Sequence, residues 1–341
     1  MPEMDGPMAA CSRQAMRQII LEAPGRFKER QGKAPEATSE EALVRVEKVG
    51  VCGSDFHAFA GRHPIYTYPR IIGHELSGVV VEAPTNHKGI RAGDRCAIEP
   101  YLTCGTCRAC SQGRNNCCEH IRILGIHVDG GMQEYLAVPI GLLHKSEKLS
   151  FDQLALVETL GIGAHAVDRA SVKPGEEILV VGAGPIGVAV AQFASAAGAR
   201  VHMVEKNEWR RSFVERMGYT ASSTAEGRHA DTVFDATGSA AAMAASLTYV
   251  ATGGKLIFVG LTRDPVCIDD ALFHRKEVTL FATRNSFGLF PRIIQLIEWK
   301  KIDTTHWVTD RLKLSQVASQ FESLPSRQTL IKAIIDLNGV E

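Results

Sequence analysis

The alternation of apolar and polar positions divides the chain into two parts. In the first part, short β-type runs occur at residues 42–49, 78–82, 95–99 and 133–138, and glycine and proline separate them. Such runs predict a mainly β domain with long loops. From about residue 158 onward, apolar runs alternate with alanine-rich stretches. That alternation predicts an α/β domain built on a doubly wound parallel sheet.

The second part contains candidate strands at 177–181, 200–204, 232–236, 255–259 and 278–282, with helices at 185–197 and 240–249. An amphipathic helix at 289–300, a helix near 314–324 and an apolar strand at 330–337 follow. Because a nucleotide-binding sheet is complete without these last elements, we expect them to return to the first domain. The predicted domains are residues 16–157 with 285–341, and residues 158–284. Residues 1–15 lack an apolar core, which predicts a disordered extension.

Composition excludes two classes of partner. The 38 basic and 38 acidic residues cancel, so the chain lacks the positive charge that binding to nucleic acid or an anionic membrane requires. The uncharged stretch 178–199 is long enough to cross a bilayer. Its glycines and Pro185 favour a strand, a turn and a helix instead. We therefore expect a small-molecule partner, with no nucleic acid and no membrane.

Cysteine spacing predicts a metal site in residues 100–120. Gaps of two residues let neighbouring thiolates converge on one ion, and the intervening glycine and asparagine residues permit tight turns. The expected ligands are Cys104, Cys107, Cys110 and Cys118. Disulfides are the alternative, and Cys117 could replace Cys118. Nine cysteines and no signal peptide favour a reducing compartment, the cytoplasm, and hence zinc. Since protein ligands alone fill this site, its expected role is structural.

A second motif predicts a dinucleotide site. A glycine-rich turn follows an apolar strand and opens a helix, the context in which a backbone turn can hold a pyrophosphate. Its residues are Gly182, Gly184, Pro185, Ile186 and Gly187. Glu205 ends the next strand, where a carboxylate accepts hydrogen bonds from the adenosine ribose and repels a 2′-phosphate, so NAD is favoured over NADP. The basic residues Lys206, Arg210 and Arg211 are the argument for NADP.

Further potential ligands lie at Cys52, His74, Glu75 and Glu158, with Ser54, Asp55 and His57 close to the first of them. Each alone is a weak signal, but together they fit an open, catalytic zinc site. With these residues, the cysteine lobe and the glycine turn, the chain resembles the zinc-dependent medium-chain dehydrogenases from residue 16 to residue 337.

The resemblance implies a GroES-like barrel domain and a Rossmann domain with the active site between them, two zinc ions per chain and NAD. By the same resemblance, Cys52, His74 and Glu158 ligate the catalytic zinc, and Glu75 ligates it or lies beside it. Asp55 would orient His74, and Ser54 and His57 would relay a proton. Thr159 stands where the polyol branch usually has a proline after the glutamate, so the chain departs from the family's pattern at this residue.

Residues 113–119, 124–131 and 273–277, with Arg284 and Asn285, resemble the polyol and sugar-acid branch. The implied reaction moves a hydride from a secondary alcohol, such as that of L-galactonate, to NAD. Thr237, Gly260 and Leu261 would border the nicotinamide, Lys332 the pyrophosphate, and Arg284 or Arg122 a substrate carboxylate. Sorbitol- or threonine-type activity, a zinc-free reductase, and a non-catalytic zinc protein are the alternatives. A homodimer or homotetramer is expected.

Overall fold

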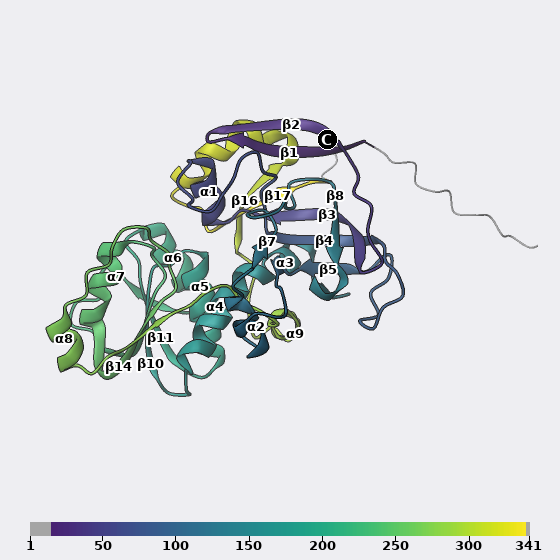
Figure 1. Ribbon diagram of the computed structural model, residues 1–341. Coiled ribbons are helices and arrows are strands. Elements are labelled where there is room, and N and C mark those ends of the chain that lie inside the picture. The colour runs from purple at the N-terminus through teal and green to yellow at the C-terminus, as the bar shows by residue number, and fades with distance from the viewer. Residues whose placement is uncertain (1–14, 339–341) are drawn as a thin grey trace, which may run out of the picture.

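The computed structural model describes residues 15–338, which form two domains side by side (Figure 1). Within these residues the first domain is built on a seven-stranded sheet with the order β16-β17-β3-β4-β5-β9, and β8 pairs with the other part of β3. Its strands are β3 (Glu41–Gly50), β4 (Glu75–Glu82), β5 (Arg95–Ile98), β8 (Tyr135–Pro139), β9 (Leu143–Lys145), β16 (Val308–Lys313) and β17 (Lys332–Asp336). The chain thus returns to the first domain at its end, because β17 pairs with β3.

Smaller elements surround this sheet. A separate hairpin joins β1 (Ala15–Ala23) to β2 (Arg26–Lys33), and a short pair joins β6 (Tyr101–Leu102) to β7 (Arg122–Ile123). The helices of this domain are α1 (Gly53–Phe59), α2 (Arg108–Ser111), α3 (Phe151–Ala155) and α10 (Val317–Gln320). The 3-10 helices are η1 (Asn115–Cys117), η2 (Ile140–Leu142), η4 (Leu314–Gln316) and η5 (Phe321–Ser326).

The second domain carries a parallel sheet with the order β12-β11-β10-β13-β14-β15. Its strands are β10 (Glu177–Val181), β11 (Arg200–Val204), β12 (Thr220–Ser222), β13 (Ala230–Asp235), β14 (Val250–Phe258) and β15 (Thr279–Ala282). Its helices are α4 (Val157–Ala170), α5 (Pro185–Ala196), α6 (Glu208–Arg216), α7 (Ala240–Ser246), α8 (Asp270–Arg275) and α9 (Phe290–Glu298), with η3 (Leu247–Tyr249). The run Ile178–Val181 is buried because both faces of this strand are covered. The predicted fold class is confirmed.

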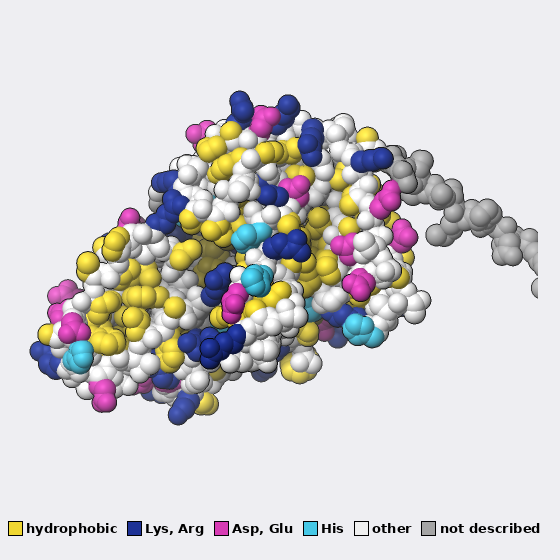
Figure 2. Space-filling model, in the orientation of Figure 1, with side chains coloured by type: hydrophobic (Ala, Val, Ile, Leu, Met, Phe, Trp, Pro, Cys, Tyr) yellow, Lys and Arg dark blue, Asp and Glu magenta, His cyan; other side chains and the backbone are white. Residues whose placement is uncertain are grey.

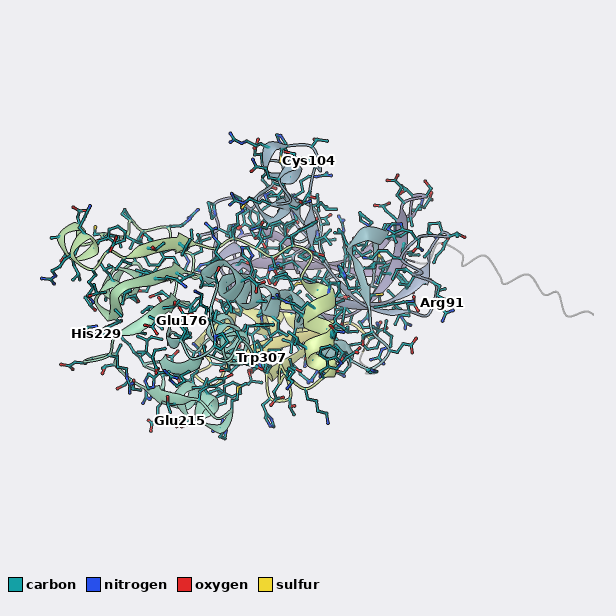
Figure 3. All side chains as sticks on the ribbon, turned by 90° about the horizontal axis from the view of Figure 1, so that it is seen from below. Arg91, Cys104, Glu176, Glu215, His229 and Trp307 are labelled. Atoms are coloured by element: carbon teal, nitrogen blue, oxygen red, sulfur yellow. The ribbon has the colours of Figure 1, made fainter. Side chains whose placement is uncertain are left out.

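Three predicted features need comment. The stretch 178–199 forms β10, a turn and α5, and no helix among residues 15–338 is long and apolar enough to cross a membrane. Helix α9 contacts both domains: Phe290, Ile293 and Ile297 pack into a core that includes α4 and α5, while the ring of Phe290 also lies 5.1 Å from the ring of His144 in β9. Trp307 belongs to the same core and lies beside this helix (Figure 3). The expected extension 1–15 lies outside the described residues except for Ala15, which begins β1.

Candidate active site

Strand pairing brings three potential metal ligands together. Cys52 precedes α1, and Glu75 begins β4 directly after His74. Because β3 and β4 are antiparallel with Gly50 opposite Glu75, the end of one strand meets the start of the other. The ligand atoms of Cys52, His74 and Glu75 all lie within 4.8 Å of one another. A side chain at position 50 would collide with Glu75, since its Cβ would lie 2.1 Å from Glu75 Oε2.

The surroundings of this group fit a metal ion. His74 Nδ1 and Ser54 Oγ are buried and have no hydrogen-bond partner among the described residues. Asp55 is fully buried and accepts a hydrogen bond from the backbone N–H of Cys52 at 2.9 Å. Its other carboxylate oxygen, Oδ1, lies 3.8 Å from His74 Nδ1, and the Tyr66 hydroxyl donates to it at 3.4 Å. Asp55 therefore faces the imidazole, as expected for a residue that orients a ligand histidine.

Lys332 takes a different place from the one the sequence suggested. Its ammonium contacts both oxygens of Glu75, at 2.6 and 2.8 Å, and donates to Val51 O at 3.2 Å. Lys332 is 2% exposed and Glu75 is 1% exposed. The expectation that Lys332 contacts the pyrophosphate is wrong, because its charge is enclosed against Glu75. The pair instead fixes one carboxylate beside Cys52 and His74.

Glu158 lies next to the same group but outside the set of three. The hydroxyl of Tyr101 donates to Glu158 Oε1, and both side chains are buried. Burial raises the pKa of Glu158, and the nearby charges of His74 and Glu75 also act on it. Ligation of zinc by Glu158 therefore stays a prediction. Sequence reasoning missed Tyr101, which carries no local signal because its partner is 57 residues away in the chain.

The two expected relay residues lie on α1. Ser54 is in the first turn with its hydroxyl buried and unpaired, and His57 is exposed in the last turn. Partial burial and the charges of Arg62 and Arg263 lower the pKa of His57. A second histidine, His63, has its pKa lowered to about 4, mainly by burial, with His57 and Arg263 contributing. At neutral pH the uncharged imidazole of His57 can accept a proton.

The cysteine lobe forms a second metal group. The sulfurs of Cys104, Cys107, Cys110 and Cys118 lie within 4.8 Å of one another. Cys117 does not join them, and its sulfur instead faces the guanidinium of Arg114 at 3.8 Å. The eight cysteines within residues 15–338 are all free thiols. The backbone N–H groups of Thr106 and Cys107 lower the pKa of Cys104 to about 6, which favours the thiolate that zinc requires. Figure 3 shows Cys104 on a lobe that projects from the body of the molecule.

The glycine turn has the geometry of a phosphate cradle. Gly182 has φ 98°, a conformation that favours glycine. A Cβ at Gly187 would lie 1.8 Å from Gly182 O, so no larger residue fits there. A Cβ at Gly184 would meet nothing within 4 Å, which leaves the backbone at the start of α5 open to a ligand. Glu205 accepts hydrogen bonds from Ala183 N at 2.9 Å and Asn207 N at 2.8 Å, so its carboxylate lies beside the turn.

Two of the three basic residues that follow Glu205 donate hydrogen bonds to backbone carbonyls. Arg211 Nη1 donates to the carbonyls of Glu205 and Lys206 at 2.8 and 2.7 Å. Arg210 Nη2 donates to Leu330 O at 2.9 Å. Lys206 is exposed. Both arginines therefore brace the backbone, which reduces their freedom to bind a 2′-phosphate.

Two loops meet at the carboxyl ends of β13 and β14. A Cβ at Gly260 would lie 2.3 Å from Gly238 N, so the two loops touch through their glycines. Asp235 is fully buried and accepts from Thr237 Oγ1 at 2.6 Å and Ser246 Oγ at 2.8 Å, which makes it a residue that holds the loop in shape. Leu261 is 81% exposed. This edge is where a nicotinamide lies in doubly wound nucleotide-binding domains.

A hollow lies between the two domains, and histidine, lysine and arginine side chains gather on its rim (Figure 2). Arg284, in the segment that follows β15, and Arg122, in β7, are both exposed. The charge of Arg284 acts on the pKa of His127, which places Arg284 near the loop 124–131. Arg122 is not among the charges that act on this histidine. Of the two arginines proposed for a substrate carboxylate, Arg284 is therefore the one whose charge acts on His127.

Comparison with known proteins agrees with this arrangement. Residues 38–148 match the alcohol dehydrogenase GroES-like domain, and residues 185–299 match the zinc-binding dehydrogenase family. The chain is 36% identical over 335 residues to L-galactonate-5-dehydrogenase of Escherichia coli K12, which covers 94% of this chain and 98% of that protein.

Solved structures are similar over almost the whole chain. A zinc-binding dehydrogenase from Sinorhizobium meliloti 1021 bound to NADP has a TM-score of 0.89 and 27% identity, and covers 95% of this chain and 100% of its own. The alcohol dehydrogenase RspB from Escherichia coli CFT073, complexed with NADH, has a TM-score of 0.88 and 26% identity, and covers 94% and 99%. The two cofactors differ, so these likenesses support a nicotinamide dinucleotide and do not choose between NAD and NADP.

Proposed function

Because the chain belongs to the zinc-dependent medium-chain dehydrogenases, as a zinc-type alcohol dehydrogenase of the sugar-acid branch, we propose that it oxidises a secondary alcohol of an aldonate such as L-galactonate and transfers the hydride to NAD. The observation that carries the proposal is the convergence of Cys52, His74 and Glu75, together with the buried, unpaired hydroxyl of Ser54 two residues after Cys52 in the chain. A purely structural zinc site would not need an unpaired hydroxyl next to it.

Different residues of the site would bind the metal ion and transfer the proton. Cys52, His74 and Glu75, with Glu158 beside them, would hold a zinc ion, which polarises the substrate hydroxyl when bound, while NAD accepts the hydride. Ser54 would accept the proton that the substrate hydroxyl loses and give up its own hydroxyl proton toward His57. His57, three residues further along α1, can take that proton toward solvent because its pKa is lowered and its ring is exposed.

The charges around the hollow support an anionic substrate. Arg62 and Arg263 act on His57, and Arg284 and Arg70 act on His127. Arg70 is paired with Asp129, so the positive charge that this group offers to a ligand comes from Arg62, Arg263 and Arg284. A carboxylate on the substrate would be attracted to such a site.

We propose NAD as the preferred cofactor and two zinc ions per chain. Glu205 supports NAD, because its carboxylate lies beside the glycine turn and would repel a 2′-phosphate. The two separate ligand groups support two ions. Replacement of Glu205 by Ala is expected to narrow the preference for NAD, measured as the ratio of kcat/KM for NAD and NADP. A native enzyme with the higher kcat/KM for NADP would reject the proposal.

We also propose a homo-oligomer in the cytoplasm. Strand β15 is the edge of its sheet, and Leu280 on it is 39% exposed, so a second copy could pair along this edge. The free thiols that the metal groups require suit a reducing compartment. Sedimentation of the purified protein would test the oligomeric state.

Steady-state kinetics with zinc-loaded enzyme and NAD test the function. The panel is L-galactonate, sorbitol, threonine and ethanol, followed by NADH absorbance. The highest kcat/KM is expected for the aldonate. Sorbitol or threonine as the best substrate would replace the aldonate within the branch, and ethanol as the best substrate would reject the branch. If none of the four substrates gives NADH, further polyols are tested with the native enzyme and with Ser54→Ala. The non-catalytic alternative is favoured if the two proteins do not differ in NADH formation on any of them.

A further inference from the structure

The loop 124–131 is fixed against the backbone that carries His74. Gly130 N donates to Ile71 O at 2.7 Å and Gly131 N donates to Gly73 O at 2.9 Å. A Cβ at Gly130 would lie 2.2 Å from Gly73 O, and one at Gly125 would lie 2.6 Å from the same atom. The glycines of this loop thus permit a contact of backbone with backbone one residue before a candidate zinc ligand. His127 belongs to this loop, whose glycines contact the backbone next to His74.

The same loop sets which nitrogen of His127 faces outward. The backbone N–H of Ile123 donates to His127 Nδ1 at 3.1 Å, and His127 N donates to Ile123 O at 2.9 Å. Because Nδ1 accepts a hydrogen bond, the neutral ring carries its proton on Nε2. Partial burial, Arg284 and Arg70 lower the pKa of His127. The ring is therefore neutral at pH 7 and offers one N–H donor.

The charge next to this donor is positive. Arg70 is paired with Asp129 at 3.2 Å, and the same carboxylate oxygen accepts from Ile71 N at 3.1 Å. The guanidinium of Arg284, by contrast, has no hydrogen-bond or ion-pair partner within residues 15–338. A neutral N–H donor and an unpaired guanidinium near each other form a combination that binds a carboxylate or phosphate.

The backbone of Arg284 is also held in place. Asn116, in the zinc lobe, donates from Nδ2 to Arg284 O at 3.0 Å. The next residue, Asn285, has φ 51°, and Gly288 N donates to Glu99 Oε1 at 3.0 Å. The lobe continues directly into β7 and the loop of His127. The backbone of Arg284 thus contacts the lobe that leads into the loop of His127.

From this geometry we propose that His127 Nε2 and the Arg284 guanidinium together bind the carboxylate of the substrate, and that His127 is the residue that separates aldonates from neutral polyols. The inference rests on the proposed function, since it names the group that recognises its substrate class. It gives a role to the motif 124–131, which the metal and dinucleotide sites leave unused.

Two variants of His127 separate the outer N–H from the loop contact. His127→Asn keeps a short polar group near Ile123 N and removes the donor at the Nε2 position. His127→Gln extends an amide to that position. The binding of L-galactonate and of galactitol, its neutral counterpart, is measured by calorimetry on the zinc-loaded enzyme with NADH, and turnover of both is measured with NAD. His229→Ala is the control, because His229 is exposed in the second domain and lies away from the first (Figure 3).

We expect His127→Asn to weaken aldonate binding by about 10-fold to 100-fold, the loss of one hydrogen bond to a charged group. Galactitol binding, the KM for NAD and the melting temperature should stay within about twofold or a few degrees of the native values. His127→Gln should recover part of the loss. Equal effects on the two ligands, or no effect on either, would overturn the proposal.

The same data distinguish this inference from the proposed function. If the native enzyme binds L-galactonate through His127 but does not oxidise it, the carboxylate subsite stands and the proposed reaction fails. If the native enzyme oxidises L-galactonate and His127→Asn leaves its Kd unchanged, the reaction stands and the subsite fails. An enzyme that binds no aldonate at all would overturn both.

Discussion

At the scale of single residues, the buried pair of Lys332 and Glu75 is the strongest constraint on the metal site. Removal of one member leaves the other charge buried and unpaired, which costs about 3–5 kcal/mol. We expect Lys332→Met to lower the free energy of unfolding of the metal-free protein by this amount, measured by urea denaturation. The double variant Lys332→Met with Glu75→Gln should recover much of the loss. Equal instability of the single and double variants would show that the charge pair is not the cause.

The pH dependence of turnover tests the relay. The exposed imidazole of His57 must be neutral to accept a proton, so kcat/KM for alcohol oxidation should fall at acid pH as His57 becomes protonated. Arg263 helps to lower the pKa of His57 by disfavouring the imidazolium. In Arg263→Gln that effect is lost, the pKa rises, and the acid limb of the profile should move to higher pH.

The control for this prediction is Arg275→Gln, which removes an exposed arginine from the end of α8 in the same domain. Its profile should match that of the native enzyme. An acid limb that stays in place in Arg263→Gln would mean that His57 does not control the profile. His57→Gln should remove the limb altogether, with kcat lower by about 10².

At the scale of elements, the turn between β10 and α5 offers a contrast between two glycines. At Gly187 a methyl group would collide with Gly182 O, so Gly187→Ala should lower the melting temperature without cofactor. At Gly184 a methyl group meets no protein atom, and φ −74° with ψ 179° suits alanine, so the fold should tolerate it. The methyl group would still lie where the pyrophosphate approaches. Gly184→Ala should therefore raise the KM for NAD by about 10-fold or more at unchanged melting temperature.

Two results would contradict these roles of Gly184 and Gly187. If Gly184→Ala binds NAD as tightly as the native protein does, measured by NADH fluorescence, the pyrophosphate does not approach the turn at this residue. If Gly187→Ala melts at the native temperature, the turn relaxes and the close packing of strand and helix is not required.

Elements were predictable where burial gives a clear pattern. Strands β10 and β11 have the bounds that their apolar runs predict; β10 is covered on both faces, and β11 pairs beside it with its last two residues buried. The hairpin of β1 and β2 was missed, and β2 lacks an apolar pattern because its residues other than Phe27 and Gly32 are polar and exposed. Strand β16 was missed for a similar reason, because only one of its six residues is buried. β-Propensity is a poor predictor of a strand that is held mainly by pairing with a neighbouring strand.

The residues of the candidate site were likewise predictable only where the sequence itself carries a signal. Spacing and motif were enough to select Cys52, His74 and Glu75, which the fold then brings together. The partners that fix them could not be predicted, because Lys332 is 257 residues from Glu75 in the chain. The return of β17 to the first domain was expected, but its pairing with β3, on which such contacts depend, is specified by no local pattern.

At the scale of the whole molecule, the two metal groups have separate roles. One projects on a lobe closed by four thiols, and the other lies at the junction of β3, β4 and α1. The lobe has few apolar residues of its own, so metal binding should supply much of its folding energy. Loss of the ion from the lobe should therefore affect the active site only through contacts such as the hydrogen bond from Asn116 to the carbonyl of Arg284.

Elemental analysis of the purified protein should return two zinc ions per chain. The Cys104→Ser and Cys52→Ser variants should each contain about one zinc ion per chain, because each substitution removes a thiolate from a different metal group. Cys104→Ser should lower the melting temperature by about 5 °C or more while the remaining folded enzyme keeps most of its kcat. Cys52→Ser should melt near the native temperature but lose about 10³-fold or more in kcat, since the ion that polarises the substrate is lost. If Cys104→Ser lost turnover without losing stability, the lobe would not be structural, and one zinc in the native protein would mean that only one of the two groups holds an ion.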